Sequence, residues 1–214
     1  ISSGMEWVWN LLTAFALLNP HADGTFTLDG ADSSSFSLQQ WRRNVAYLPQ
    51  KPMLMGDSVA DTIRLPWTLA VRRADEASAP DNHAATGKKT SARRGRFSRL
   101  FRSEQSQAKL ALPDQLIRNT LDAMGCEDID LARAPHDLSG GQAARVSLAR
   151  TLLTRPAVLL ADEVDAGLDD DNADKVASIM ASAAAGGMAI VRIRHRPPDG
   201  RSTRIVTLSS GRLS

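Results

Sequence analysis

Two short segments constrain this chain more than anything else in its sequence. The first is the Leu-Ser-Gly-Gly-Gln run from Leu138 to Gln142, and the second is the apolar run that starts at Val158 and ends in Asp162-Glu163. Between them, apolar residues recur at helical spacing from Ala143 to Arg155, until Pro156 stops the pattern. The predicted order is therefore a glycine turn, a helix, a short loop and a buried strand with an acidic tip.

The residue types in both segments suit a ligand that contains phosphate. Ser139 can cap the following helix, and Gly140 and Gly141 let backbone N–H groups approach an anion at the helix N-terminus. Asp162 and Glu163 would place a metal-binding oxygen beside a base for water. Either pair alone is typical of an ordinary loop or a solvated strand end, but their order and spacing together are specific.

Together the segments resemble the signature motif and the Walker B motif of ATP-binding-cassette (ABC) ATPases. The family usually carries Gln-Arg after the signature, and here Ala144-Arg145 keeps only the arginine. The resemblance implies an α/β fold of the P-loop NTPase type, with a mostly parallel sheet and a small antiparallel β portion. It also implies a single ABC-type nucleotide-binding domain over residues 1–214, in which a helical subdomain at about residues 54–138 carries the signature.

Three further segments resemble motifs of the same family. Gln50, after a predicted strand from Asn44 to Leu48, resembles the Q-loop glutamine, which implies contact with magnesium and the attacking water; the alternative is a solvated turn glutamine. Ala166-Gly167-Leu168-Asp169 resembles the D-loop, usually Ser-Ala-Leu-Asp, which implies that Asp169 lies near a partner subunit. His195 follows a predicted strand from Met188 to Ile193 and resembles the switch histidine, which implies a bond to the γ-phosphate.

The residues around His195 depart from the family pattern. An acidic residue usually follows the histidine, whereas Arg196-Pro197-Pro198 follows it here. Arg192 and Arg194 are also unexpected, because strands buried in a parallel sheet are near-continuous apolar runs.

The rest of the pattern predicts short elements that alternate along the chain. Asp29-Gly30 is typical of a hairpin turn, and Gly186-Gly187 is typical of a helix end. The predicted helices are 11–18, 36–43, 110–124 and 170–185, and the other predicted strands are 25–28 and 205–208, the latter followed by a turn at 210–212.

The glycine-rich phosphate loop that this family needs is not intact. The matching place runs from Ile1 to Leu12, where Gly4 remains as a candidate for nucleotide binding, no lysine occurs, and Glu6 would repel phosphate. Codons for Met5 to Asn10, read one base later, allow Ser-Gly-Ser-Gly, so a reading-frame error in the gene or its sequencing is one explanation and a degenerate loop is the other. Because Ile1 is not a start methionine, we expect a truncated N-terminus or a misplaced start.

The segment from Arg72 to Lys109 differs from the rest of the chain. It carries ten Lys or Arg against four acids, a net charge of +6, so the other residues sum to −4 within the total of +2. Its lack of apolar periodicity predicts a mobile insertion. Contact with anionic lipid headgroups is the functional interpretation, with Phe97, Leu100 and Phe101 entering the interface, and a solvated loop is the alternative. Few aromatic residues lie among the charges, so we expect no nucleic-acid partner.

Composition excludes several classes of protein. The single cysteine, Cys126, excludes an intrachain disulfide framework and fits a reducing cytosol. No run of about 18 apolar residues occurs, so the chain is not expected to span a membrane by itself. The apolar residues from Trp7 to Leu18 lack a preceding basic stretch, so we expect no signal peptide.

The resemblance implies the ATP-hydrolysing subunit of an ABC membrane transporter, which couples hydrolysis of ATP with Mg²⁺ to substrate translocation. Glu163 would orient or deprotonate water, Asp162 and Gln50 would serve Mg²⁺, and His195 would hold the γ-phosphate. Residues 139–142 would bind the nucleotide of a second ABC subunit, identical or different. The other expected partner is a membrane-embedded permease, which implies a cytoplasmic protein, peripheral on the inner face of the cell membrane.

Two other functions stay open. A degenerate subunit would hydrolyse nothing and would donate its signature motif to a partner; the missing lysine favours it, and the intact Glu163 does not. A soluble, non-transport ABC protein acting on ribosomes or DNA is suggested only by the basic insertion, and such proteins usually carry two cassettes in one chain. Among the transporters, the run from Gly56 to Trp67 resembles small ATPases of metal or iron export.

Overall fold

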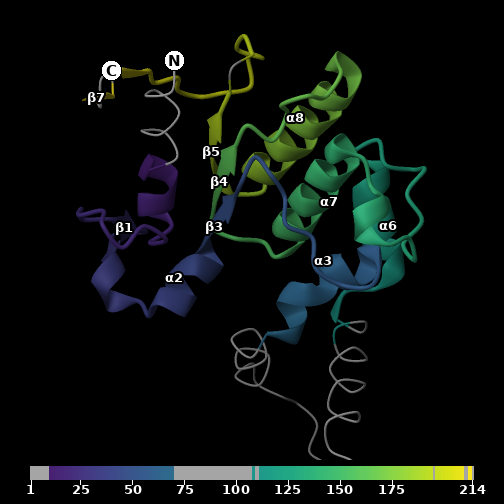
Figure 1. Cartoon of the computed structure of the whole chain (residues 1–214). Helices are drawn as coiled ribbons and strands as arrows, with labels where there is room; N and C mark the ends of the chain where they lie inside the picture. The colour runs from purple at the N-terminus through teal and green to yellow at the C-terminus, as the bar shows by residue number, and fades with distance from the viewer. Residues whose placement is uncertain (1–9, 70–107, 109–110, 195, 210–211, 214) are drawn as a thin grey trace, which may run out of the picture.

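The computed structural model describes residues 10–69, 108, 111–194, 196–209 and 212–213. Its centre is a parallel sheet in the order β3-β4-β5, formed by Val45–Leu48, Val158–Asp162 and Ala189–Ile193. Val45 pairs with Val158, and Val158 pairs with Ala189, so the strands start level with one another. Their carboxyl ends therefore meet at one edge of the sheet (Figure 1).

Helices cover both faces of this sheet (Figure 1). One face carries α7 (Gly140–Leu153) and α8 (Asp170–Ala185), and α3 (Val59–Thr68) and α6 (Asp114–Asp122) pack against α7. The other face carries a helix whose described residues are 10–15, α2 (Leu38–Asn44), and the antiparallel hairpin of β1 (Thr27–Leu28) and β2 (Ala31–Asp32). The predicted α/β architecture, with a parallel sheet and a small antiparallel portion, is confirmed.

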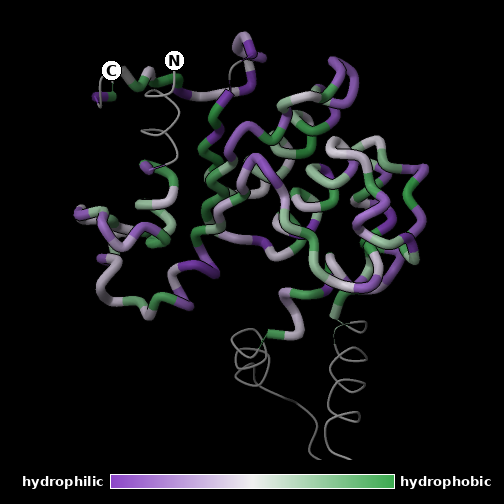
Figure 2. Tube along the Cα trace, in the orientation of Figure 1, coloured by the Kyte–Doolittle hydropathy of each residue, from purple (hydrophilic) through white to green (hydrophobic). Residues whose placement is uncertain are grey.

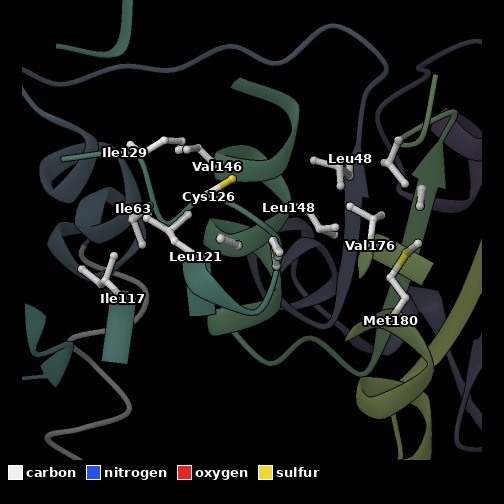
Figure 3. Close-up of a cluster of buried hydrophobic side chains, with 14 of the residues drawn as sticks. Leu48, Ile63, Ile117, Leu121, Cys126, Ile129, Val146, Leu148, Val176 and Met180 are labelled. Carbon is white, nitrogen blue, oxygen red and sulfur yellow. The ribbon is translucent and has the colours of Figure 1, made fainter. Parts of the chain in front are cut away.

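Two apolar clusters fill the space between the sheet and its helices, and β4 contributes to both. Leu159 and Ala161 belong to the cluster with α7 and α8, whereas Leu160 belongs to the cluster with α2. All three are at most 1% exposed, so β4 is buried on both faces, as its continuous apolar run predicts. Figure 2 shows apolar residues concentrated along the central strands. Figure 3 shows part of the larger cluster, from Leu48 of β3 to Met180 of α8.

Local capping sets where the helices begin. Ser139 before α7 and Ser37 before α2 each accept a hydrogen bond from the backbone N–H three residues further on. In both places that third residue is a glutamine, whose side-chain oxygen accepts the backbone N–H of the serine. Asp169 caps α8, whose bounds agree with the prediction, and Gly186 follows its last residue.

Several predicted bounds are wrong at their ends. The helix predicted at 143–155 is α7, so Gly140 and Gly141 form its first turn instead of a separate turn before it. The described part of the first helix stops at residue 15, and Leu17 has a left-handed φ of 52°. The strand predicted at 205–208 is found as β6 (Leu208–Ser209), which pairs with β7 (Arg212–Leu213), whereas Ile205 and Val206 are exposed and outside any strand. Helix α2 is shifted toward the C-terminus from the predicted range 36–43, and α6 is shorter than the predicted range 110–124. Strands β1 and β5 are shorter than the predicted ranges 25–28 and 188–193.

Short 3-10 turns at Ser33–Ser35 (η1) and Pro135–Asp137 (η2) complete the described elements. Among the described residues, none of the helices has the length and apolar content to cross a membrane. Apart from Ala108, the basic insertion at 72–109 lies outside the described residues, and the bounds 54–138 of the helical subdomain stay a prediction.

Candidate functional site

Two carboxylates lie at the carboxyl end of β4. Asp162 is the last residue of the strand, and Glu163 is the first residue beyond it. Glu163 has a left-handed φ of 49°, and its N–H donates to the carbonyl of Ile193 on β5 at 3.2 Å. The chain therefore turns at the edge where the three strands end.

Gln50 joins this pair from the neighbouring strand. It lies two residues beyond the end of β3, and its Nε2 donates to Oε2 of Glu163 at 2.9 Å. The register explains the contact, because Leu48 pairs with Ala161 and the residues that follow each strand meet. The structure thus brings together Gln50, Asp162 and Glu163, and their chemical roles remain predictions.

Tyr47 belongs to the same group, although the sequence did not single it out. Its hydroxyl donates to Oδ2 of Asp162 at 3.1 Å. Tyr47 pairs with Leu160 and so lies on the face of the sheet that Asp162 shares, two residues further along β4. The alternation of side chains along a strand could have indicated the face on which Tyr47 lies, but it does not identify the neighbouring strand.

The acidic end of β4 suits a magnesium ion that arrives with a nucleotide. Magnesium is usually held by one or two carboxylates together with phosphate oxygens and water. Asp162 supplies a half-buried carboxylate that Tyr47 orients. In the described part of the chain, no three His, Cys, Asp or Glu side chains gather closely enough to hold a metal on their own. The residues present therefore fit magnesium bound through its substrate.

The N-terminus of α7 has the geometry of an anion-binding helix end. Oγ of Ser139 accepts the N–H of Gln142 at 3.2 Å, and Oε1 of Gln142 accepts the N–H of Ser139 at 3.0 Å. The N–H groups of Gly140 and Gly141 precede the first intrahelical bonds and point along the helix axis. A methyl group at Gly140 would meet no atom within 4 Å, so a ligand can approach there. Nε2 of Gln142 donates to Asp128 at 2.7 Å and is engaged within the chain.

The segment after Glu163 packs against this helix end. A methyl group on Gly141 would lie 3.0 Å from Cδ2 of Leu168, so glycine permits the close approach. Asp169 caps α8 by accepting the N–H and the side-chain amide of Asn172, at 2.9 and 2.6 Å. Those hydrogen bonds hold the pKa of Asp169 below its usual value. Its contact with a partner subunit stays a prediction.

Two predicted site residues, Gly4 and His195, lie outside the described residues. The neighbours of His195 are described, and both bind the segment that follows Glu163. Nε of Arg194 donates to Asp165 at 2.9 Å, and Nη1 of Arg196 donates to Asp170 at 2.9 Å. The chain on either side of the histidine is therefore tied to residues 165–170.

Comparison with known proteins decides the family. The family model described as ABC transporter matches residues 10–166, which include Gln50, the helix α7 with its two glycines, and Asp162-Glu163 at the end of β4. The chain belongs to the ABC transporter family. The predicted family is confirmed, and it is a family of ATP-hydrolysing enzymes.

Individual ABC proteins agree with this assignment. "Probable iron export ATP-binding protein FetA" of Escherichia coli K12 is 30% identical over 166 residues, which cover 78% of this chain and 57% of FetA. "Uncharacterized ABC transporter ATP-binding protein YknY" of Bacillus subtilis 168 is 26% identical over 216 residues, covering 99% of this chain and 77% of YknY. The chain thus spans just over half the length of FetA, and 12% of the sophorolipid transporter of Starmerella bombicola.

Solved ABC structures share the fold. The dimeric, post-hydrolysis structure of the ATP-binding cassette MJ0796, bound to ADP and Pi, has a TM-score of 0.59 at 19% identity and covers 88% of this chain and 69% of that one. The cbiO1 component of the cbiONQ transporter complex from Clostridium perfringens has a TM-score of 0.57 at 20% identity, covering 89% and 64%. At such identities the likeness shows the fold alone, and that fold is the predicted ABC cassette.

Proposed function

We propose that this ABC protein is the ATP-hydrolysing subunit of a membrane transporter, in which hydrolysis drives translocation of a substrate. The observation that carries the proposal is the 2.9 Å hydrogen bond from Nε2 of Gln50 to Oε2 of Glu163, beside Asp162. An amide that donates to a carboxylate oxygen fixes the position of that side chain, and a carboxylate held in place is what a general base needs.

The residues at the strand ends divide the work of hydrolysis. Glu163 orients the attacking water or accepts its proton, and Gln50 keeps that carboxylate in place. Asp162 and Gln50 would hold Mg²⁺, which when bound neutralises negative charge on the phosphates. His195 would donate a hydrogen bond to the γ-phosphate.

Helix α7 supports the proposal of an assembly of two ABC subunits. Its capped N-terminus combines free N–H groups with the positive end of the helix dipole, and both favour a phosphate. In the proposal, Ser139, Gly140, Gly141 and Gln142 bind the nucleotide of a second subunit, identical or different. Asp169 lies in the segment that would contact that subunit.

A cavity of about 620 Å³ supports the second proposed partner, a membrane-embedded permease. It lies between the end of the first helix, α2, β3, and the ends of α3 and α7. Its lining combines apolar walls from Leu18 and Leu69 with three arginines, Arg42, Arg43 and Arg150, and the described residues that line it include no acid. Such a cavity suits an amphipathic segment of the permease that carries acidic side chains.

Arg150 links this cavity to the candidate site. Burial lowers the pKa of Arg150, because it withdraws part of the charged group from water. A nearby acidic side chain of a partner would compensate for this loss of hydration. Nη1 of Arg150 donates to the carbonyl of Met53 at 3.2 Å, three residues after Gln50. A permease segment seated here would contact the residue that holds the loop after Gln50. With such a partner, the protein would lie in the cytoplasm, on the inner face of the cell membrane.

The sequence also favours a second candidate, a non-hydrolysing ABC subunit that donates residues 139–142 to a partner. Residues 1–12 contain no lysine. Hydrogen bonds to charged groups contribute about 1.5–3 kcal/mol each. Losing two of them would weaken ATP binding by about two to four powers of ten.

Calorimetric titration and hydrolysis assays on three forms of the chain separate the candidates. The chain as written should bind Mg²⁺-ATP at millimolar levels or more weakly. Replacing residues 6–10 by Ser-Gly-Ser-Gly-Lys-Ser-Thr should restore tight binding and hydrolysis, and a further Glu163→Gln change should keep binding and stop hydrolysis. A repaired chain that binds ATP without hydrolysing it would favour the non-hydrolysing subunit. Micromolar binding by the chain as written would contradict our account of its N-terminus.

A further inference from the structure

Glu163 is held in a backbone conformation that its residue type disfavours. Its φ of 49° lies in the left-handed region, which crowds the side chain of any L-residue. Its N–H donates to the carbonyl of Ile193 at 3.2 Å, and its carbonyl accepts the N–H of Ala166 at 3.0 Å. The first of these bonds persists only while β5 and the loop after Glu163 stay together.

Four charged side chains link the loop after Glu163, β5 and the segment that follows β5. Asp165, 3% exposed, comes from the loop after Glu163. Its Oδ2 lies 2.9 Å from Nε of Arg194 and 3.7 Å from Nη2 of Arg192. Oδ2 of Asp199 lies 2.8 Å from Nη1 of Arg194 and 2.9 Å from Nη1 of Arg192. The two arginines are thus held between two carboxylates.

The cluster brackets the hydrogen bond that holds Glu163. Arg192 and Arg194 stand on either side of Ile193, and because they are two residues apart in an extended chain, they share one face. Asp165 reaches that face from two residues beyond Glu163. Ion pairs therefore tie the chain together on both sides of the bond from the Glu163 N–H to the Ile193 carbonyl.

Stability alone does not explain a cluster of this kind. Taking charges out of water is costly, and pairing recovers the cost only when the geometry is complete. Nε and Nη2 of Arg192 are buried and have no hydrogen-bond partner among the described residues. An incompletely paired, buried cluster is a poor stabiliser, so its geometric effect on the neighbouring turn becomes the better explanation.

We propose that Asp165 is a positioning residue for Glu163: through Arg192 and Arg194 it keeps the Glu163 backbone in its left-handed turn and so aims the carboxylate at the site. The inference rests on the proposed function of Glu163. It also gives a role to two arginines that are unexpected in a parallel strand.

Backbone amide exchange of Glu163 tests the proposal on the full chain. The sequence has five glutamates, Glu6, Glu76, Glu104, Glu127 and Glu163, so a chain labelled with ¹⁵N only at glutamate gives few signals. The Glu163 signal is the one that Glu163→Gln removes. Asp165→Asn should speed hydrogen exchange of this amide at least tenfold, and Asp165→Glu should restore most of the protection. Asp174→Asn is the matched control, because it breaks the exposed 2.7 Å ion pair with Arg201 instead.

Urea unfolding of each variant separates positioning from a general loss of stability. Faster exchange at Glu163 than the fall in global stability accounts for would support the proposal. Unchanged exchange in Asp165→Asn, an effect equal to the global loss, or an equal effect from Asp174→Asn would each overturn it. If Asp165→Asn does not fold, Arg194→Lys serves in its place, because it keeps one charge and should raise exchange in the same direction.

The outcome is independent of whether the chain hydrolyses ATP, because no nucleotide is present in this measurement. Failure of hydrolysis in the repaired chain would remove the proposed function of Glu163 and leave the exchange result intact. If the repaired chain hydrolyses ATP, Asp165→Asn should lower kcat at least tenfold and change KM less than twofold. A change in KM alone would contradict positioning.

Discussion

Asp162 and Glu163 are adjacent, yet each is held by a different side chain at the end of β3. Tyr47 donates to the half-buried Asp162, and Gln50 donates to Glu163 in a more exposed position. Tyr47→Phe should lower the free energy of unfolding by about 1–2 kcal/mol, because Asp162 loses a donor that water replaces only in part. Urea titration followed by circular dichroism measures the change.

Two comparisons check that this loss comes from the pair. Gln50→Ala should lower the free energy of unfolding by less than about 0.5 kcal/mol, since water can replace an exposed bond. In a double-mutant cycle with Asp162→Asn, the losses of Tyr47→Phe and Asp162→Asn should not add. Strict additivity would mean that the two side chains are not coupled.

At the scale of elements, α7 and α2 begin with the same local structure but face different surroundings. Ser139 and Ser37 each form a capping box with a glutamine three residues on. Ser139→Ala and Ser37→Ala should each lower the free energy of unfolding by about 1 kcal/mol. Only Ser139→Ala should also reduce ATP hydrolysis by an assembly with a subunit whose phosphate loop is intact, because only α7 would face the nucleotide.

Parallel unfolding and hydrolysis assays on the two variants decide between a structural and a functional cap. Equal losses of hydrolysis in both variants would show that stability alone is responsible. No loss in Ser139→Ala would argue against binding of the partner's nucleotide at this helix end.

At the scale of the whole molecule, one acidic residue fixes the segment beyond β5 to the sheet. Burial by itself would raise the pKa of Asp199, but the N–H of Arg201 and the guanidinium of Arg192 outweigh it and lower that pKa below 3.8. A carboxyl group with a lowered pKa in the folded state adds stability above its ordinary pKa and loses it as the pH falls through the folded value. Asp199→Asn should therefore destabilise the protein near neutral pH, and its deficit should shrink as the pH falls from about 5 to about 3.

Urea titrations of Asp199→Asn and the unmodified chain across that pH range measure the difference. Asp174→Asn is the control, because no buried arginine depends on that carboxylate. A deficit that stays constant down to about pH 3 would contradict the lowered pKa.

The charge of the chain is unevenly distributed. Residues 72–109 carry +6, whereas the remainder of the chain carries −4. The full chain should bind vesicles that contain phosphatidylserine and release them at high salt, with each basic residue near the surface contributing about 1 kcal/mol at most. Deleting residues 75–107 should abolish this binding in a sedimentation assay. Equal binding by the deleted chain would leave the segment as a solvated insertion.

Features that depend only on neighbouring residues could be predicted from the amino-acid sequence. Capping by Ser139, a helix that ends before Pro156, the buried acidic strand after it and the bounds of α8 were predicted correctly, because capping, apolar period and helix breakers act within a few residues. The prediction was wrong for Ile205 and Val206. These residues have the apolar, branched side chains typical of a strand, but a strand forms only where a neighbouring chain segment can pair with it.

Which distant side chains meet depends on how the strands pair, and the sequence does not show that pairing. Gln50 reaches Glu163, and Tyr47 reaches Asp162, because β3 and β4 are parallel neighbours in register. Arg192 and Arg194 are unexpected from the sequence, because strands of a buried parallel sheet are usually apolar. The structure explains them, because Asp165 from the loop after β4 and Asp199 from the segment after β5 pair with both arginines. Periodicity reports the face on which a side chain lies, whereas the identity of its neighbour is a contact between distant residues that packing alone creates.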